Sequence, residues 1–360
     1  MNYRAALAHF PKITYGRYKK ILDLFSDLKN LWQAEMEELT QAGLEENIAH
    51  EFLLWRESNP AGSILERMKK EKIKTVSLGD PAYPALLAEI NDPPMTLFYR
   101  GVLEADNGPA VAVVGTRNCT MYGQQVCVEI SGALARQGIT VVSGLALGLD
   151  GAAHQAALEN KGRTIAVLGS GIDDAHIYPS AHRPLAQKII AEGGAVVSEY
   201  PPGFLAAPYS FPARNRIIAG LSLGTLVVEA PEESGALITA RCALDYNREV
   251  FAVPHNITSA NGVGCNNQLK LGAKLVTSAD DILEALNLKS LAQTVLLKKE
   301  PAASNPTEEA VLAQLSREPK HIDAVAKETG IDSRLISSTL TLLEIKGVVK
   351  NLGGMNYVVS

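Results

Sequence analysis

The sequence predicts an α/β fold with a parallel-sheet core, preceded by a helical region and followed by a winged helix. Short β-branched runs alternate with helical stretches from residue 110 to about 286. Apolar residues recur at helical spacing before residue 70, and residues 306–360 have the pattern of three helices and two strands. Strands that alternate with helices indicate a parallel sheet, whereas the two flanking patterns indicate smaller units of their own.

Residues 1–70 are predicted to form only helices. Apolar side chains recur at helical spacing in 21–28 and in 31–39, and Gly16 and Gly43 interrupt the pattern. The short helices resemble a SAM-like or helix-hairpin-helix unit, which would bind DNA backbone or protein. A small domain that only packs on its neighbour is the favoured alternative.

The segment that follows contains prolines and opens the predicted core, 71–287. Pro81, Pro84, Pro93 and Pro94 exclude one continuous helix, and short strand-like runs lie at 75–78 and 96–99. We expect this segment to extend the neighbouring sheet rather than to form a free linker.

The core itself contains seven short apolar runs, each followed by a turn rich in Gly, Pro or Ser and then by a candidate helix. The runs are 111–114, 140–142, 164–168, 195–198, 225–228, 249–253 and 274–277. Such strands predict a parallel sheet that is covered on both faces. Ligands bind these sheets at the carboxyl ends of the strands, so the turns after them are the candidate functional edge.

Residues 288–305 are predicted to be a linker, and 306–360 a winged helix. Asn305 and Pro306 have the pattern of a helix start, a second helix covers 321–329 and a third covers 332–346. Two strands about Gly353-Gly354 complete the unit. The helix in the recognition position has only Arg334 and Lys346 as cations, so a weak nucleic-acid contact and a protein contact are both open.

Composition excludes several classes of function. The formal net charge is −5, so any anion site must be confined to a cleft rather than spread over a basic surface. The four cysteines lack zinc or disulfide spacing, which predicts reduced thiols and no metal. No signal-peptide pattern and no membrane-spanning run occur, so we expect a cytoplasmic protein that does not enter a membrane.

The stretch Phe211–Gly220 is the first candidate for a binding site. Arg214 and Arg216 flank Asn215, and no acidic residue occurs between Glu199 and Glu229. Guanidinium groups without a carboxylate nearby in the sequence suit phosphate, and Phe211 could stack on an unpaired base. The alternative, with Phe211 in the core and both arginines paired to distant carboxylates, is about as good on this stretch alone.

Three glycine-containing turns raise the weight of the phosphate interpretation. They follow the first three core strands and comprise Gly115-Thr116-Arg117, Ser143-Gly144, and Gly169-Ser170-Gly171, with Arg183 a short distance beyond the third. Glycines let backbone N–H groups approach an anion, and a helix that begins there adds its dipole. We therefore expect Arg117, Arg183, Arg214 and Arg216 to converge on one phosphate-binding cleft.

Other conspicuous residues have simpler interpretations. Asp150 and Ser234 are predicted to be helix N-caps, and His154 and His255 to be structural. Glu229, at the end of an apolar strand, is either a catalytic carboxylate or a hydrogen-bond acceptor for a glycine loop, and we favour the second. No Walker, dinucleotide, zinc-protease or nucleophile-elbow motif occurs, so no cofactor is expected.

In this order, these turns resemble the DNA-processing protein A family. The resemblance rests on the segments Tyr83-Pro84, Gly115-Thr116-Arg117, 143–154, Tyr178-Pro179, 198–203, 211–222, 228–230, 234–239 and 272–276. It implies an extended Rossmann fold that binds and protects single-stranded DNA and loads the RecA recombinase onto it, notably in natural transformation. It further implies a homodimer that needs no nucleotide cofactor.

The resemblance also implies roles for individual residues. Arg117 matches a DNA-contacting arginine, Arg183 a basic position after Tyr-Pro, and 211–216 a third contact region, whereas the dimer surface would lie near 262–271. Family members often have a base just before the Phe-Pro pair, but 206–210 has none. This departure would weaken the affinity or move the contact to Arg183 and Lys188.

Two other functions stay open at this point. Gly224-Thr225 and Glu229 distantly resemble nucleotide phosphoribohydrolases of the lysine-decarboxylase-like Rossmann group, in which Glu229 would be catalytic. The Pro-Gly-Gly that usually precedes that motif is missing, because 219–222 reads Ala-Gly-Leu-Ser. A duplex-DNA repressor built on the winged helix is the third and weakest alternative.

Overall fold

The computed structural model describes residues 2–288, 306–316, 319–345, 348–351 and 353–359. The chain divides into two compact units, 1–292 and 293–360, which are described separately. The predicted linker 288–305 lies, apart from Leu288, outside the described residues, as do Asn305 and Lys346.

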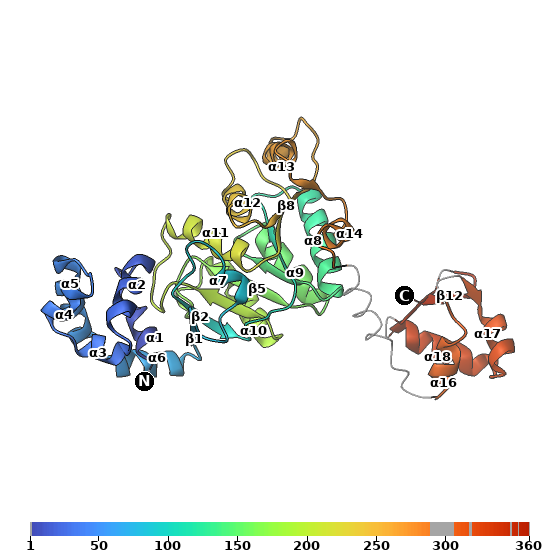
Figure 1. Ribbon diagram of the computed structural model, residues 1–360. Coiled ribbons are helices and arrows are strands. Elements are labelled where there is room, and N and C mark those ends of the chain that lie inside the picture. Colours follow the sequence, from blue (N-terminus) through green and yellow to red (C-terminus); the bar gives the residue numbers. More distant parts are fainter. Residues whose placement is uncertain (1, 289–305, 317–318, 346–347, 352, 360) are drawn as a thin grey trace. The chain divides into compact units, whose positions relative to one another are not determined.

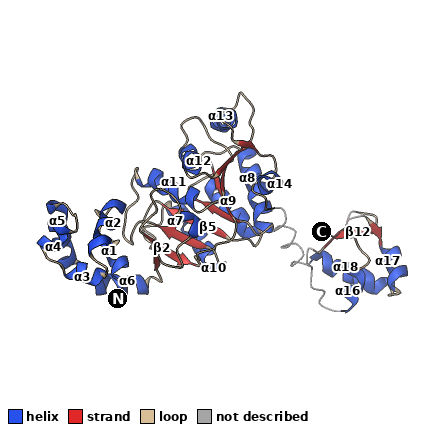
Figure 2. Ribbon diagram, viewed as in Figure 1, coloured by secondary structure: helices blue, strands red, loops and turns tan. Residues whose placement is uncertain are grey.

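A nine-stranded sheet of order β1-β2-β6-β5-β4-β3-β7-β8-β9 forms the centre of the first unit (Figures 1 and 2). The seven predicted core strands are all present and run parallel to one another. They are β3 (Ala110–Val114), β4 (Thr140–Ser143), β5 (Thr164–Leu168), β6 (Ala195–Ser198), β7 (Gly224–Val227), β8 (Glu249–Ala252) and β9 (Lys274–Leu275). The chain proceeds from β3 to β4 on one side and later returns to β7 on the other, so β3 marks the switch point of the sheet.

The apolar runs form buried strands because each sends successive side chains to opposite covered faces. In β3, Ala112 and Val114 pack with Ile217 in one core cluster, whereas Val111 and Val113 pack in another. Helices α11 (Ser210–Gly220) and α12 (Gly235–Asp245) cover the first face. The second is covered by α8 (Met121–Arg136), α9 (Leu149–Glu159) and α14 (Ala279–Ala285).

The proline-marked segment extends the sheet, as predicted. Strand β1 (Lys74–Ser77) pairs antiparallel with β2 (Thr96–Gly101), and β2 pairs antiparallel with β6. Between them, the Tyr83 hydroxyl donates to the Pro94 carbonyl at 2.7 Å and α7 (Ala85–Ala88) forms a single turn.

The N-terminal region is helical, as predicted. It comprises α1 (Tyr3–Leu7), α2 (Tyr15–Leu24), α3 (Leu28–Gln33), α4 (Met36–Gln41), α5 (Glu46–Ser58) and α6 (Ala61–Lys70). Most of its apolar side chains form a core of their own, but Ala5 and Met68 join Phe98 of β2 in a shared cluster. Arg4 also forms an ion pair with Asp80 at 3.0 Å. Because these contacts place helices and sheet in one compact unit, the domain boundary near residue 70 stays a prediction.

Two further helices of the first unit come from the second half of the core sequence. They are α10 (Arg183–Ala191) and α13 (Val263–Lys270), each preceded by a short 3₁₀ turn, Ser180–His182 and Ala260–Gly262 respectively. None of the helices in the described part of the chain is long and apolar enough to cross a membrane.

The second unit is a winged helix, as predicted. It contains α16 (Pro306–Leu312), α17 (Ile322–Thr329), α18 (Ser333–Ile345) and the hairpin of β11 (Val349–Asn351) and β12 (Asn356–Val359). A short strand that the sequence did not indicate, β10 (Lys320–His321), adds to β12. Gly330 ends α17 with φ +68°, and Val311, Val325, Ile336 and Leu340 form the core.

Candidate nucleic-acid interface

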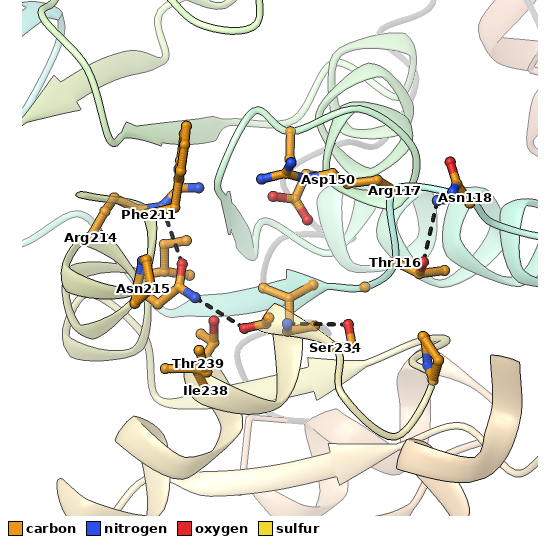
Figure 3. Close-up of a pocket in the computed structure, with 18 of the residues that line it drawn as sticks. Thr116, Arg117, Asn118, Asp150, Phe211, Arg214, Asn215, Ser234, Ile238 and Thr239 are labelled. Atoms are coloured by element: carbon orange, nitrogen blue, oxygen red, sulfur yellow. Dashed lines mark hydrogen bonds between the residues drawn. The ribbon is translucent and has the colours of Figure 1, made fainter. Parts of the chain in front are cut away.

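A cavity of about 400 Å³ opens at the carboxyl ends of the strands around β3 (Figure 3). The loop after β3, helix α11 and the start of α12 form its walls, and Ala146 of the loop after β4 and Asp150 of α9 also line it. This is the switch-point crevice in which open α/β sheets bind ligands. It is called the switch-point pocket below.

The loop after β3 is held by the main chain of its neighbours. The Thr116 N–H donates to the Glu229 carbonyl at 2.8 Å, and the Thr116 hydroxyl accepts from the Asn118 N–H at 3.2 Å. Gly148 has φ +76°, and a Cβ there would lie 2.5 Å from the carbonyl oxygen of Arg117. Glycine at this position therefore lets the second turn close against the first, which fixes the loop while Arg117 and Asn118 stay exposed.

Arg117 is the free cation of the pocket. Its side chain is exposed and forms no hydrogen bond or ion pair with any residue that the structure describes. Its Cζ lies 5.4 Å from the ring centroid of Phe211, which is a cation–π contact. The contact orients the guanidinium but uses none of its N–H groups, so the donors remain open to an anion.

Phe211 belongs to a pair of aromatic side chains beside the pocket. Its ring centroid lies 5.6 Å from that of Tyr178, whose side chain is 49% exposed. Both rings line a narrow second cavity together with Gly144, Leu147, Gly169 and Pro179. An exposed ring next to a free guanidinium is the combination that stacks on unpaired bases and holds their phosphates.

Arg214 lines the same pocket but is not free. It is only 5% exposed, and its guanidinium donates to the carbonyls of Gly144 and Val167 at the ends of β4 and β5. Burial lowers the pKa of Arg214 to about 10, whereas the nearby Asp150 carboxylate favours the charged form. The group stays protonated at neutral pH, but its position is that of a structural anchor.

The prediction that Asp150 is a helix N-cap is wrong. Helix α9 begins at Leu149 with Gly148 as its N-cap, so Asp150 lies inside the first turn. Its Oδ2 accepts from the Gly144 N–H at 3.1 Å, and burial raises its pKa. The sequence pattern could not reveal this role, because it depends on the turn after β4 folding back onto the helix.

The predicted convergence of four arginines on one cleft is wrong for Arg216 and Arg183. Arg216 forms ion pairs with Glu199 at 2.7 Å and Asp92 at 3.0 Å, so the alternative of distant carboxylate partners holds for it. Arg183 donates to the carbonyls of Ala175 and Ile177. Neither side chain lines the switch-point pocket, because each points to partners on a different segment.

The other predicted residues divide in the same way. Asn215 lines the pocket, but its amide accepts from Arg214 Nε at 3.2 Å and donates to the Gly235 carbonyl at 3.1 Å (Figure 3). Ser143 and Ser170 are fully buried and bond main chain. The residues that line one of the two cavities are Gly115, Thr116, Arg117, Gly144, Gly169, Phe211, Arg214 and Asn215; those that do not are Ser143, Ser170, Gly171, Arg183 and Arg216.

Several pocket residues were missed in the sequence. Asn118, Ile238 and Thr239 line the pocket together with Ser234, which caps α12 as predicted by accepting from the Ala236 N–H at 3.3 Å. The predicted N-cap was the available signal, since a helix start at a sheet edge is itself an anion site.

The Glu229 carboxylate accepts hydrogen bonds from within the fold. It is fully buried, and its two oxygens accept from the Thr120 N–H and hydroxyl, each at 2.9 Å. The carboxylate therefore holds the first turn of α8. His154 and His255 are also bonded within the fold, to the Thr164 hydroxyl at 2.6 Å and the Val228 carbonyl at 2.8 Å.

A Rossmann-like sheet with an arginine-bearing pocket at its switch point, joined in one chain to a winged helix, defines a class of two-part α/β proteins. The chain belongs to the DNA-processing protein A family. The family model for DNA recombination-mediator protein A matches residues 74–287, and the model for the DprA winged helix domain matches 297–355. This confirms the resemblance inferred from the motifs.

Individual relatives agree. The chain is 36% identical to protein Smf of Synechocystis sp. over 94% of each chain. It is similar to the X-ray structure of DNA processing protein A from Streptococcus pneumoniae, with TM-score 0.65, 36% identity, and 79% of this chain and 97% of that one covered. The Helicobacter pylori protein, described for its single-stranded DNA binding mode, gives TM-score 0.53 and 29% identity, with 61% and 97% covered.

Proposed function

We propose that this protein binds single-stranded DNA at the switch-point pocket, protects it and presents it to the RecA recombinase. The observation that carries the proposal is Arg117, an exposed guanidinium with no partner among the described residues, held over the ring of Phe211. Single-stranded DNA binding by the Helicobacter pylori relative supports the same conclusion. Phosphate would be held by Arg117 and unpaired bases by Phe211.

Single-stranded rather than duplex DNA is favoured by the kinds of group on the surface. An aromatic face is useful only to a base that is not already stacked in a duplex. The recognition helix α18 exposes Leu335 and Leu342 beside Arg334, so it has few charges for phosphates. This argues against the duplex repressor and favours a protein contact for the winged helix.

Assembly as a homodimer and delivery to RecA are the parts of the proposal that come from the family. The surface expected for the dimer, residues 262–271, contains Leu271, which is 78% exposed. Leu271 lines a surface hollow together with Leu244 of α12 and Gln268 of α13. Burying these side chains against a second copy would remove apolar area from water. A protein that acts on recombining strands together with RecA would be located in the cytoplasm.

In this proposal the protein binds DNA and catalyses no reaction. A phosphoribohydrolase would need Glu229 to reach a substrate, but both of its oxygens are bonded to Thr120 in a fully buried position. Incubation with AMP should release no free base. Release of adenine that disappears in Glu229→Gln would overturn this part of the proposal.

The principal test is the binding of a fluorescent oligo-dT strand and its duplex, measured by anisotropy over a series of salt concentrations. We expect preference for the single strand and an affinity that falls steeply with salt, since phosphate contacts release counterions. Equal affinity for the duplex, or no binding at low salt, would overturn the proposal. RecA filament formation on a strand covered by a single-strand-binding protein then tests loading.

A further inference from the structure

The wall of the switch-point pocket opposite Arg214 is the beginning of helix α12. This helix has 11 residues, begins at Gly235 and has Ser234 as its N-cap. The first N–H groups of a helix carry partial positive charge and favour anions. A helix end alone does not define a site, so the side chains around it decide what binds there.

Thr239 is a side chain at this helix end that indicates a ligand. It is 1% exposed and lines the pocket, yet its hydroxyl forms no hydrogen bond within the described part of the chain. Figure 3 shows its hydroxyl directed at the pocket, below Asn215. The rest of the residue is buried and its oxygen is reached only from the cavity, so a group that enters the cavity can hydrogen-bond to it.

Two further unpaired donors face the pocket from the opposite side. Arg117 has no hydrogen-bonding partner among the described residues, and the same holds for the side-chain amide of Asn118, whose main chain bonds Thr116 and Asn261. The pocket therefore presents a guanidinium, an amide and a hydroxyl from three elements, together with a helix N-terminus. Asp150 is the one acid in its lining, and it lies beside Arg214.

The depth of the pocket selects the kind of phosphate. Its lining includes the buried residues Val114, Ile218 and Thr239, so a group that reaches Thr239 enters the crevice with its end first. A phosphodiester inside a strand has chain on both sides and fits the rim, where Arg117 lies. A phosphomonoester has one free end and carries close to two negative charges at neutral pH.

We propose that the switch-point pocket is a subsite for a terminal phosphomonoester, either the phosphorylated end of a DNA strand or a free nucleoside monophosphate. The inference rests on the proposed function, because Arg117 would then hold the strand at the rim while its end enters the pocket. Thr239 and the first turn of α12 bind the phosphate oxygens, and Asn118 lies on the facing wall of the pocket.

The test compares oligo-dT strands of about 12 nucleotides with a 5′-phosphate, a 3′-phosphate or hydroxyl ends. The full chain should bind one phosphorylated strand about tenfold more tightly than the hydroxyl-ended strand, since a charge-assisted hydrogen bond has about that effect. In Thr239→Val, which keeps the shape and removes the hydroxyl, this ratio should fall to about one third of its value or less.

Thr225→Val is the matched control. Thr225 of β7 is also buried with an unpartnered hydroxyl, but it lies outside the pocket lining. The same substitution there should keep the ratio unchanged. An equal fall of the ratio in both variants would overturn the role of Thr239.

Competition by dTMP, with thymidine as its control, separates the two sources of the phosphate. Displacement by dTMP without any effect of strand phosphorylation assigns the pocket to free nucleotides. Equal binding of all strands and no effect of dTMP overturns the inference but leaves single-strand binding intact. If no strand binds, the proposed function fails, and calorimetry with dTMP alone then decides for or against the subsite.

Discussion

The loop after β3 and helix α11 both bring arginine to one pocket, but they use it in opposite ways. Arg117 on the loop is exposed, contacts the ring of Phe211 and has no hydrogen-bonding partner in the described part of the chain. Arg214 on the helix is buried against the ends of β4 and β5, and Arg216 is paired with Glu199 and Asp92. The lack of acidic neighbours in the sequence is shared by all three, so it does not distinguish a ligand-binding arginine from an anchor.

The difference follows from where each segment lies. Helix α11 packs on the sheet, where the last carbonyls of the strands need donors and a guanidinium supplies several at once. The loop after β3 projects beyond the sheet, so its side chain reaches no such acceptor. Arginines on the covering helix therefore stabilise the fold, whereas the loop arginine is available for a ligand.

Replacement of Arg214 should give the largest effect. In Arg214→Met, two buried carbonyls lose their donor and Asp150 loses its nearest cation, which should lower the free energy of unfolding by about 3–5 kcal/mol. Urea unfolding measures this loss. Arg117→Met is the control and should change stability by less than about 0.5 kcal/mol; equal stability of the two variants would remove the distinction.

Replacement of Arg117 should act on binding alone. Arg117→Ala removes a charge-assisted phosphate contact and should weaken single-strand affinity at least tenfold, on the order of 1.5–3 kcal/mol. Arg136→Ala removes an exposed arginine on α8 outside the pocket and is the matched control. Anisotropy titration at fixed salt would contradict the assignment if both variants bound like the unaltered chain.

The anchored region should also respond to acid. Burial lowers the pKa of His154 to about 3, and the charges of His182 and Arg214 act in the same direction. The unfolded chain takes up the proton at its higher, ordinary pKa, so stability is complete above that value and falls as the pH drops toward the folded one. Between pH 7 and pH 5 the free energy of unfolding should therefore fall by about 2 kcal/mol because of His154 alone. Urea unfolding at the two pH values measures this difference, and His154→Gln should abolish it.

Arg216 should give the smallest change. Its ion pairs are partly exposed, with 28% and 55% exposure at Glu199 and Asp92, so Arg216→Gln should lower the unfolding free energy by only about 1 kcal/mol. Single-strand affinity should change by less than about twofold. A tenfold loss of affinity would mean that Arg216 exchanges its carboxylates for phosphate and belongs with Arg117.

The parallel strands could be predicted because their signal is local. A run such as 165–168 is apolar throughout since both of its faces are covered, and the turn residues near its ends mark its extent. The winged helix was equally accessible, because Gly330 marks the end of its second helix and the Gly353-Gly354 pair marks the turn of its hairpin. Short β10 was missed, since two residues carry no periodic pattern.

The pocket could be predicted only in outline. Gly115, Arg117 and Phe211 were found because strand-end turns and aromatic residues are visible in the sequence. The partners of Asp150 and Arg216 were not, since Gly144, Glu199 and Asp92 come near them only when the turn after β4 and the segment before β2 fold onto the core. Contacts between distant segments decide which polar side chains are free, and spacing along the chain does not record them.

Glu229 also limits how this architecture can evolve. The carboxylate that a hydrolytic relative would direct at its substrate here holds Thr120, the residue that caps α8. Freeing it would leave the Thr120 N–H and hydroxyl without this acceptor, at a loss of about 1 kcal/mol before any new reaction is gained. The same carboxylate cannot hold Thr120 and reach a substrate at once, so this strand end can serve only one of the two uses.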